Sequence, residues 1–482
     1  MLGSATIFAA SLFSMRLSRL FSAILLSSVL ITTGAGCFGG GSDSAATAKL
    51  TLKVWGVFDE DDAWKTITDG YRAQHPNVTV EYTKLRFEDY KDELIRAIAE
   101  GKGPDVMAVH NTWLGGFKDL MIPMPDAVSV AHVETQGALR KEQVLVSTSQ
   151  STMSMKTLKT NFVPAVIEDV VMSYQKDEKS DPIDKIFGLP MSVDTLALYY
   201  NQDMLNAAGI PQPPATWSDF QQAVKTMTKI DATGKITQSG IGMGTGDNVE
   251  RASDILSVLM MQNGAQMTDD RDRITFNDIP EGTPRDVNPG LDAVRFYTDF
   301  ANPTKEVYTW SDTMPSSLDA FVNGQAAMFL GYSYHLPIIR TLAPKLNMGI
   351  AALPQISSST TETQQVNYAN YWVESVSKST EYEDYAWDFV LFATGKDNVG
   401  SYLTEGKKPT ALRSLIDDQL NDEDIGIFAE QLLTAKSWYR GNDADAAEDA
   451  IAQLINDINA NTYEDPQDAL DNTARVVAQT YL

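Results

Sequence analysis

Strand and helix patterns alternate along residues 51–109, and few folds can accommodate that order. Alternating, β-rich stretches predict three strands, while apolar residues at helical spacing fill the two intervals between them. The strands are predicted at Thr51–Trp55, Val78–Tyr82 and Asp105–Val109, and the helices are marked by Trp64, Ile67 and Tyr71 and by Tyr90, Leu94 and Ile98. Strands that are joined through helices pair in parallel, so this region predicts an α/β fold with helices on both faces of a sheet.

The length and the net charge of the chain further limit the classes of protein to which it can belong. With 482 residues, the chain is long enough for two or three compact units. Apolar residues make up 43% of it, which allows a sizeable core. The 64 Asp and Glu residues against 38 Lys and Arg give a formal net charge of −26, which argues against a nucleic-acid partner.

The sequence offers little for a metal, a cofactor or catalysis. It has one cysteine, Cys37, and four histidines without a His-Glu-x-x-His spacing. It also lacks a Gly-x-x-x-x-Gly-Lys-Ser/Thr phosphate loop and a Gly-x-Ser-x-Gly nucleophile elbow. We therefore expect no metal, no cofactor and no enzyme activity, although a glycosidase with two carboxylates facing a sugar stays an alternative.

The first fifty residues predict export. Arg16 and Arg19 precede an uncharged run, Leu20–Gly36, which is the layout of a secretory signal peptide. Translation can start at Met1 or at Met15, because the residues before Met15 add nothing that a signal peptide needs.

The residues around Cys37 resemble a bacterial lipobox, in which the cysteine is acylated and becomes the new N-terminus. Gly34 departs from that pattern, which prefers Leu, Val or Ile three residues before the cysteine. We predict a signal peptide over residues 1–36, a lipidated Cys37, and a flexible tether over residues 37–49. The alternatives are an uncleaved signal anchor and a free buried thiol.

A series of motifs runs in consistent order from about residue 50 to the C-terminus, and together they resemble one family. That family is the family 1 extracellular solute-binding proteins, the maltose-binding-protein-like lipoproteins of bacterial ABC importers. The motifs are Val54–Gly56, Gly101–Val106, Pro190–Asn201, Leu205–Ile210, Pro214–Phe220, Asn323–Met328 with Gly331 and Tyr332, and Gly349–Pro354.

The resemblance implies a two-lobe periplasmic-binding-protein fold, in which each lobe is a mostly parallel sheet flanked by helices. Three crossover strands join the lobes, and we place them near residues 190–194, 370–373 and 408–410. Lobe 1 then comprises residues 50–192 and 371–409, and lobe 2 comprises residues 193–370 and 410–482. A solute binds between the lobes, and a hinge movement closes them around it.

Candidate ligand-binding residues follow from the chemistry of a sugar. Aromatic rings suit its apolar C–H faces, and carboxylate or amide side chains suit its hydroxyls. Core packing is the alternative for each ring, and a solvated face or a plain turn is the alternative for each polar residue. The candidates are Asp59, Glu60, Asn111, Trp113, Asp194, Asp247, Tyr332, Trp372 and Trp438.

The predicted function is that of an exported, lipid-anchored protein on the outer face of the cytoplasmic membrane. It captures a sugar or oligosaccharide and delivers it to an ABC permease, and we expect it to be a monomer. One alternative keeps the fold but binds a polyamine or another cationic or peptide-like solute, which would suit the acidic composition. Another alternative is a surface lipoprotein that acts as a sensor or an adhesin.

Overall fold

The structure, a computed structural model, describes residues 48–137, 141–356 and 365–482. These residues belong to one compact unit that begins at residue 43. Cys37, the predicted signal peptide and most of the predicted tether lie outside the described residues, so lipidation at Cys37 stays a prediction.

The first sheet contains the three strands predicted near the N-terminus and one strand from far along the chain. Its order is β2 (Val78–Lys84), β1 (Leu50–Gly56), β3 (Val106–His110) and β15 (Trp372–Val376). Strand β1 pairs in parallel with β2 and with β3, whereas β15 runs antiparallel to β3. The predicted parallel arrangement is therefore confirmed for residues 50–110.

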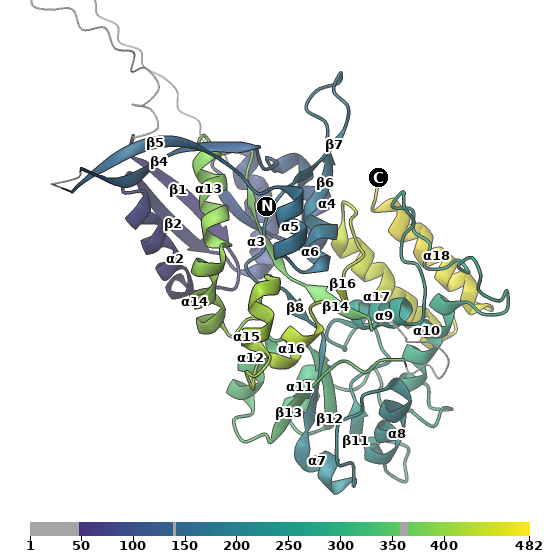
Figure 1. Cartoon of the computed structure of the whole chain (residues 1–482). Helices are drawn as coiled ribbons and strands as arrows, with labels where there is room; N and C mark the ends of the chain where they lie inside the picture. Colours follow the sequence, from purple (N-terminus) through teal and green to yellow (C-terminus); the bar gives the residue numbers. More distant parts are fainter. Residues whose placement is uncertain (1–47, 138–140, 357–364) are drawn as a thin grey trace, which may run out of the picture. The chain divides into compact units, whose positions relative to one another are not determined.

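Helices from both ends of the chain cover this first sheet. Helix α2 (Asp61–Gln74) buries Trp64, Ile67 and Tyr71, the three residues whose spacing predicted it. Helix α3 (Phe87–Ala99) buries Tyr90 and Leu94 in the same way. The later helices α13 (Glu383–Ala393) and α14 (Lys396–Gly406) pack beside α2, and the hairpin of β4 (Ala127–Gln136) and β5 (Glu142–Ser151) lies against α13 (Figure 1).

The second sheet differs from the mostly parallel sheet that was expected. Its order is β10 (Lys229–Ile230), β11 (Ile236–Ile241), β12 (Ala326–Gly331), β9 (Ala197–Asn201) and β13 (Met348–Ala351). Only the β11–β12 pair is parallel, and β9 runs antiparallel to both of its neighbours. Strand β9 enters this sheet from the crossover strand β8, so no helical connection from β11 or β12 sets its direction parallel to theirs.

A small central sheet connects the two larger ones. It consists of β16 (Ala435–Lys436), β14 (Asn367–Asn370) and β8 (Asp194–Thr195), with β8 antiparallel to β14. Strand β8 leads into β9 of the second sheet, and β14 leads through Tyr371 into β15 of the first. A bridge between Ser192 and Thr410 adds the third predicted crossover. The three segments predicted to cross between lobes thus lie side by side.

The remaining elements complete the layers around the sheets (Figure 1). The second sheet is accompanied by α7 (Gln202–Ala207), α8 (Trp217–Met227), α9 (Ala252–Gln262), α10 (Pro289–Thr298), α11 (Ser317–Val322) and α12 (His335–Leu342). Helix α17 (Ala444–Ala460) packs on α9, α10 and the last helix, α18 (Pro466–Gln479). Short elements are α4 (Leu114–Phe117), α5 (Met155–Asn161), α6 (Pro164–Val170), β6 (Val171–Tyr174), β7 (Ile183–Ile186), α15 (Ile416–Gln419) and α16 (Gly426–Gln431).

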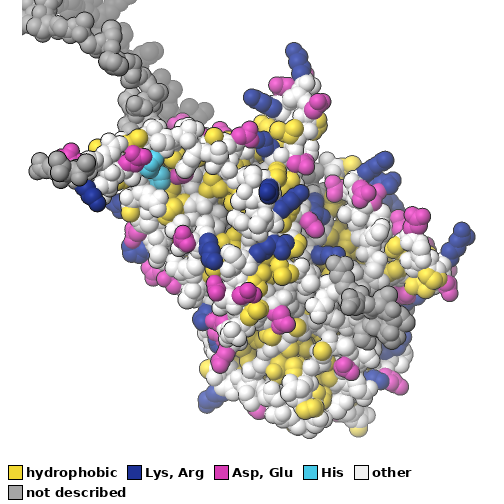
Figure 2. Space-filling model, viewed as in Figure 1, with side chains coloured by type: hydrophobic (Ala, Val, Ile, Leu, Met, Phe, Trp, Pro, Cys, Tyr) yellow, Lys and Arg dark blue, Asp and Glu magenta, His cyan; other side chains and the backbone are white. Residues whose placement is uncertain are grey.

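Charged side chains of both signs lie on the surface of the described residues (Figure 2). On the face shown in Figure 2, acidic side chains are spread out, with Lys and Arg side chains among them. Within residues 48–137, 141–356 and 365–482, no helix combines the length and the apolar character that crossing a bilayer requires.

Candidate functional site

A cavity of about 40 Å³ lies where β1 and β3 end and β15 begins. Because β15 runs antiparallel to β3, its first residue, Trp372, pairs with His110, the last residue of β3. We call this space the Trp372 cavity. It is lined by Gly56, Val57, Phe58, Asp59, Trp64, Tyr82, Ala108, Met191, Ser192, Trp372, Glu374, Tyr402 and Lys408.

Aromatic rings gather at the Trp372 cavity, and two of them are largely exposed. The Phe58 and Phe87 side chains are 59% and 48% exposed, and their rings stack with centroids 5.7 Å apart. The Trp372 ring meets Phe58 edge-on at 5.8 Å and Trp113 edge-on at 5.2 Å. Exposed, stacked phenyl rings offer an apolar surface to a solute.

Polar side chains line the same cavity as the Trp372 and Phe58 rings. Lys408 donates hydrogen bonds to Asp59 and, at 2.7 Å, to the hydroxyl of Tyr402, which in turn donates to Asp59 Oδ2 at 2.7 Å. Glu374 is 6% exposed, and its Oε2 atom has no hydrogen-bond partner among the described residues. Burial, followed by the nearby Asp59 carboxylate, raises the pKa of Glu374 to about 8.

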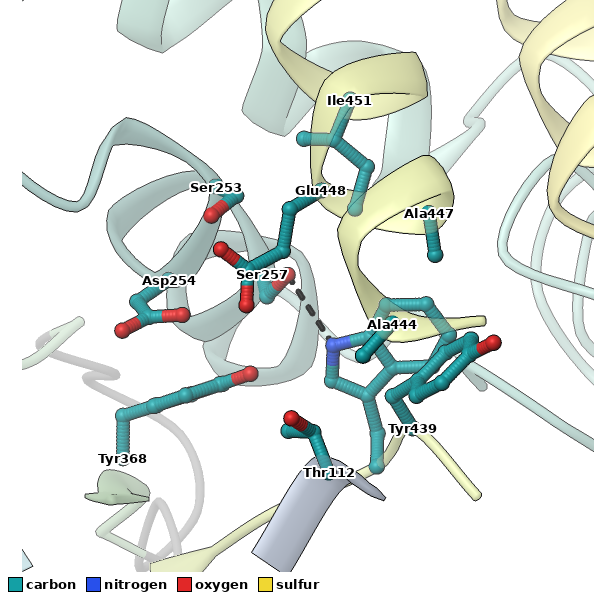
Figure 3. A pocket seen from close by; sticks show the side chains of 11 residues that line it. Thr112, Ser253, Asp254, Ser257, Tyr368, Tyr439, Ala444, Ala447, Glu448 and Ile451 are labelled. Atoms are coloured by element: carbon teal, nitrogen blue, oxygen red, sulfur yellow. Dashed lines mark hydrogen bonds between the residues drawn. The ribbon is translucent and has the colours of Figure 1, made fainter. Parts of the chain in front are cut away.

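A second, smaller cavity, of about 10 Å³, lies between α9 and α17 (Figure 3). We call it the Trp438 cavity. The Trp438 indole is buried and donates a hydrogen bond to Ser257 Oγ at 3.1 Å. The cavity is lined by Thr112, Ser253, Asp254, Ser257, Tyr368, Trp438, Tyr439, Ala444, Ala447, Glu448 and Ile451.

An ion-pair network around the buried Asp254 borders the Trp438 cavity. Arg251 donates to both carboxylate oxygens of Asp254, at 2.8 and 3.0 Å, and to Glu448 Oε1 at 3.3 Å. The hydroxyl of Tyr332 donates to Asp254 Oδ2 at 2.6 Å. Arg251 has a left-handed backbone (φ 57°), which is uncommon for a residue with a side chain. The guanidinium is therefore held by two carboxylates.

The turn after β3 links the two cavities. His110 lies edge-on against Trp372 with centroids 5.3 Å apart, and its Nδ1 atom is 2.8 Å from Thr112 Oγ1, which lines the Trp438 cavity. Burial, followed by the positive charge of Arg251, lowers the pKa of His110 to about 4. His110 is thus a neutral group that lies between the aromatic rings and the ion-pair network.

Asp194 occupies the central crossover, where it faces the second sheet. Its carboxylate accepts hydrogen bonds from the backbone and the hydroxyl of Ser333, at 2.9 and 2.7 Å, and from the backbone of Thr195. Burial raises the pKa of Asp194 to about 6, although the Ser333 hydrogen bonds oppose that change. The neighbouring Tyr334 is 46% exposed and stacks on Tyr332, so it presents a ring next to Asp194.

The structure brings some predicted residues together and separates others. Asp59 and Trp372 line one cavity, Trp113 lies against Trp372, and Trp438 lines the other cavity. Tyr332 is fully buried behind Asp254. The remaining polar candidates lie elsewhere: Glu60 is exposed and accepts from Lys84 at 2.5 Å, and Asp247 is exposed and accepts from Asn456 at 2.9 Å.

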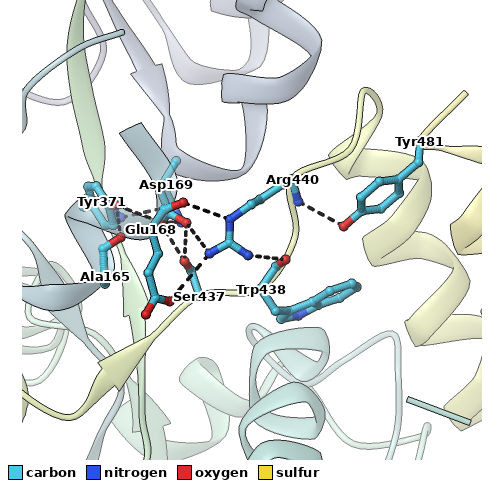
Figure 4. Close-up of polar contacts among 9 residues, drawn as sticks. Ala165, Glu168, Asp169, Tyr371, Ser437, Trp438, Arg440 and Tyr481 are labelled. Carbon is cyan, nitrogen blue, oxygen red and sulfur yellow. Dashed lines mark hydrogen bonds and ion pairs between the residues drawn. The ribbon is translucent and has the colours of Figure 1, made fainter. Parts of the chain in front are cut away.

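Asn111, also a candidate, donates a hydrogen bond to Asp169. Figure 4 shows the polar network of Asp169 with Tyr371, Ser437 and Arg440. The buried Asp169 carboxylate accepts from Asn111 at 3.4 Å, from Tyr371 at 2.7 Å and from Ser437 at 2.6 Å. Arg440 donates to the same carboxylate at 3.1 Å. This network ties α6 to the segment between β14 and β15 and to the chain that follows β16.

Next to that network, the backbone of α4 packs closely against the backbone of residues 440–442. A Cβ atom on Gly115 would come within 2.3 Å of the Arg440 carbonyl oxygen, and one on Gly116 would come within 2.4 Å of the Asn442 carbonyl oxygen. Only glycine allows α4 to approach the chain after β16 so closely.

Sequence reasoning missed several residues at these cavities. Phe58 and Phe87 were overlooked because single phenylalanines at element ends carry no pattern. Arg251, Asp254 and Glu448 come from helices far apart in the sequence, so no local motif joins them. Glu374 could have been found from the sequence, because it is an acidic residue within the mostly apolar strand Trp372–Val376.

A metal centre is not supported by the part of the chain that the structure describes, because no group of three His, Cys, Asp or Glu side chains there is arranged to hold an ion. The cavities instead combine aromatic surfaces with hydrogen-bonding groups, an arrangement that binds a polar organic solute.

Comparison with known proteins agrees with the binding of a solute. A family model described as bacterial extracellular solute-binding protein matches residues 66–424. The chain belongs to this family. The resemblance drawn from the sequence motifs is thereby confirmed.

Individual relatives of this solute-binding protein are distant in sequence. The galactooligosaccharide-binding protein of Bacillus subtilis (strain 168) is 20% identical over 411 residues, which cover 84% of this chain and 83% of that protein. Among solved structures, the cyclic α-maltosyl-1,6-maltose binding protein of Arthrobacter globiformis has a TM-score of 0.66 at 20% identity, covering 90% of this chain and 99% of its own. The sugar-binding protein MalE of Xanthomonas citri also has a TM-score of 0.66, at 16% identity, covering 90% and 97%. These similarities establish the two-lobe fold.

Proposed function

We propose that this solute-binding protein captures a carbohydrate and hands it, chemically unchanged, to an ABC importer. The observation that carries the proposal is the exposed aromatic surface of Phe58 and Phe87, which adjoins Trp372 and the polar groups Asp59 and Lys408. Sugars need this combination, because their ring faces are apolar and their edges carry hydroxyls. The names of the relatives from Bacillus subtilis and Arthrobacter globiformis support an oligosaccharide.

Isothermal titration calorimetry tests the proposal. Purified mature protein is titrated with galacto-oligosaccharides, maltodextrins, cyclic maltosides and their monosaccharides. Phe58→Ala should weaken binding of the active sugar by about 1–2 kcal/mol, since a stacking ring is lost. Leu342→Ala is the matched control, because Leu342 is 58% exposed but lies in α12, away from both cavities. No heat with any sugar would remove carbohydrate from the proposal.

Capture depends, in this proposal, on closure of two lobes. Lobe 1 comprises residues 50–192 and 371–409, and lobe 2 comprises residues 193–370 and 410–482. The packing of α13 and α14 on α2, and of α17 on α9, supports this division. A solute that contacts both lobes favours the closed state. Small-angle scattering should therefore show a smaller radius of gyration with solute than without it.

The protein is, in this proposal, attached to the outer face of the cytoplasmic membrane through Cys37. Acyl chains on that cysteine would hold the folded domain near its permease by means of the 37–49 tether. Cys37→Ser should release the protein from the membrane fraction, and mass spectrometry of the wild-type N-terminus should show the lipid. We also propose a monomer, which light scattering would check.

A further inference from the structure

Glu374 is the least satisfied charged side chain at the site. It lies in β15, between Val373 and Ser375, and it is 94% buried while Oε2 lacks a hydrogen-bond partner within the described residues. A buried carboxyl oxygen without a hydrogen-bond partner is costly, so a ligand that donates to it would be favoured at this position. Glu374 lines the Trp372 cavity.

The charges that line this cavity do not balance. The charged residues there are Asp59, Glu374 and Lys408. The Lys408 ammonium is already occupied, because it donates to Asp59 and to the Tyr402 hydroxyl. With both carboxyls ionised, the lining therefore has one uncompensated negative charge, and that charge belongs to Glu374.

The walls of the cavity suit a cation. Phe58, Trp64, Tyr82, Trp372 and Tyr402 all line it, and aromatic faces attract ammonium groups. The cavity already contains one such contact, since Lys408 Nζ lies 4.8 Å from the centre of the Tyr402 ring. An acidic group beside several aromatic rings is the arrangement that recognises an organic ammonium ion.

We propose that the Trp372 cavity takes the protonated amino group of the solute, with Glu374 as its counter-ion and the surrounding rings as its walls. This inference rests on the proposed capture of a carbohydrate and deepens it, because it makes an amino sugar the solute. A polyamine carries the same chemical group and is the other possible source.

Binding then displaces a proton. The titratable groups that face Glu374 are Asp59 from the end of β1, Tyr82 from β2, Tyr90 from α3, Tyr402 from α14, and Lys408. Burial and the Asp59 charge keep Glu374 protonated near neutral pH, since its pKa is raised to about 8. When the ammonium group enters, the carboxylic acid gives its proton to solvent and the positive charge of the solute replaces it, so the charge balance is kept.

Calorimetry at pH 7 in two buffers of different ionisation enthalpy measures this exchange. The probes are glucosamine and the deacetylated disaccharide of chitosan, with glucose and cellobiose as their neutral counterparts, and spermidine as the polyamine. We expect the aminated sugars to bind at least about tenfold more tightly than the neutral ones. We also expect release of up to one proton for each aminated molecule bound.

Glu374→Gln removes the charge of this group and keeps its shape. The variant should lose both the preference for aminated sugars and the proton release. Glu178→Gln is the matched control, because Glu178 is exposed in the loop between β6 and β7. A thermal melt verifies folding, and the proton release of the wild-type protein tests the proposal without any variant.

The outcomes distinguish this inference from the proposed function. Equal affinity for aminated and neutral sugars, or binding without proton release, overturns the ammonium site and leaves carbohydrate capture intact. Binding of spermidine with proton release, and of no sugar, supports the ammonium site and overturns carbohydrate capture. Absence of binding by every probe overturns both.

Discussion

The ammonium of Lys91 in α3 lies 2.8 Å from the carboxylate of Asp445 at the start of α17. The same Nζ atom stands 5.2 Å from the centre of the Trp113 ring. This ion pair joins a helix that covers the first sheet to a helix that borders the Trp438 cavity. It therefore links parts of the chain that we assign to different lobes.

Asp445→Asn should weaken solute binding modestly by removing one contact that favours closure. Asp445 is 63% exposed, so the expected loss is about 0.2–1 kcal/mol of binding free energy, and it should shrink in high salt. Titration at low and high ionic strength checks this. Asp449→Asn, on the same helix and exposed, is the control and should leave the affinity unchanged.

Trp372 and Trp113 should respond differently to truncation. Trp372→Ala should cost about 1–3 kcal/mol of binding free energy, because Trp372 lines a cavity beside exposed rings. Trp113 is 8% exposed and packs on Phe117 and Trp372, so Trp113→Ala should lower the free energy of unfolding by about 3–5 kcal/mol. Urea denaturation together with calorimetry separates the two effects. A Trp113→Ala protein of unchanged stability would contradict this assignment.

Asp254→Asn should destabilise the protein strongly. The substitution leaves the Arg251 guanidinium with Glu448 as its remaining charged partner in the network, and loss of one member of a buried ion pair costs about 3–5 kcal/mol. The control is Asp292→Asn, which breaks an ion pair of similar sequence spacing with Arg295 that is about half exposed on both sides. Chemical denaturation of the two variants should differ by more than about 2 kcal/mol.

Glu374 should make stability depend on pH. Its pKa rises from 4.5 to about 8 on folding, so between these values the folded protein holds a proton that the unfolded chain has released. This stabilising contribution is fully present below the lower value and is lost as the pH rises through the higher one. Relative to Glu374→Gln, the wild-type protein should lose up to about 1.4 kcal/mol per pH unit in that window. Urea denaturation at pH 5.5, 6.5 and 7.5 measures the slope, and a slope of opposite sign would refute the assignment.

Local patterns predicted the fold well because they depend on neighbours in the sequence. The spacing of Trp64, Ile67 and Tyr71 predicted the buried face of α2. The mixed second sheet was missed, because strand direction depends on the path of the chain between strands.

The candidate ligand-binding residues stay predictions, and the structure brings only some of them together. Asp59 and Trp372, which follow or begin strands, line one cavity. Tyr332 was expected to face a solute, but its hydroxyl binds Asp254, a residue from another helix. Such pairings arise from tertiary packing, and periodicity in one segment cannot reveal them.

The pairing of β15 with β3 has a consequence for how the protein is made. Residues 106–110 stay an open sheet edge until residues 372–376 have been synthesised, because that late segment supplies the fourth strand. Most of the polypeptide must therefore leave the ribosome before its first layer can be completed.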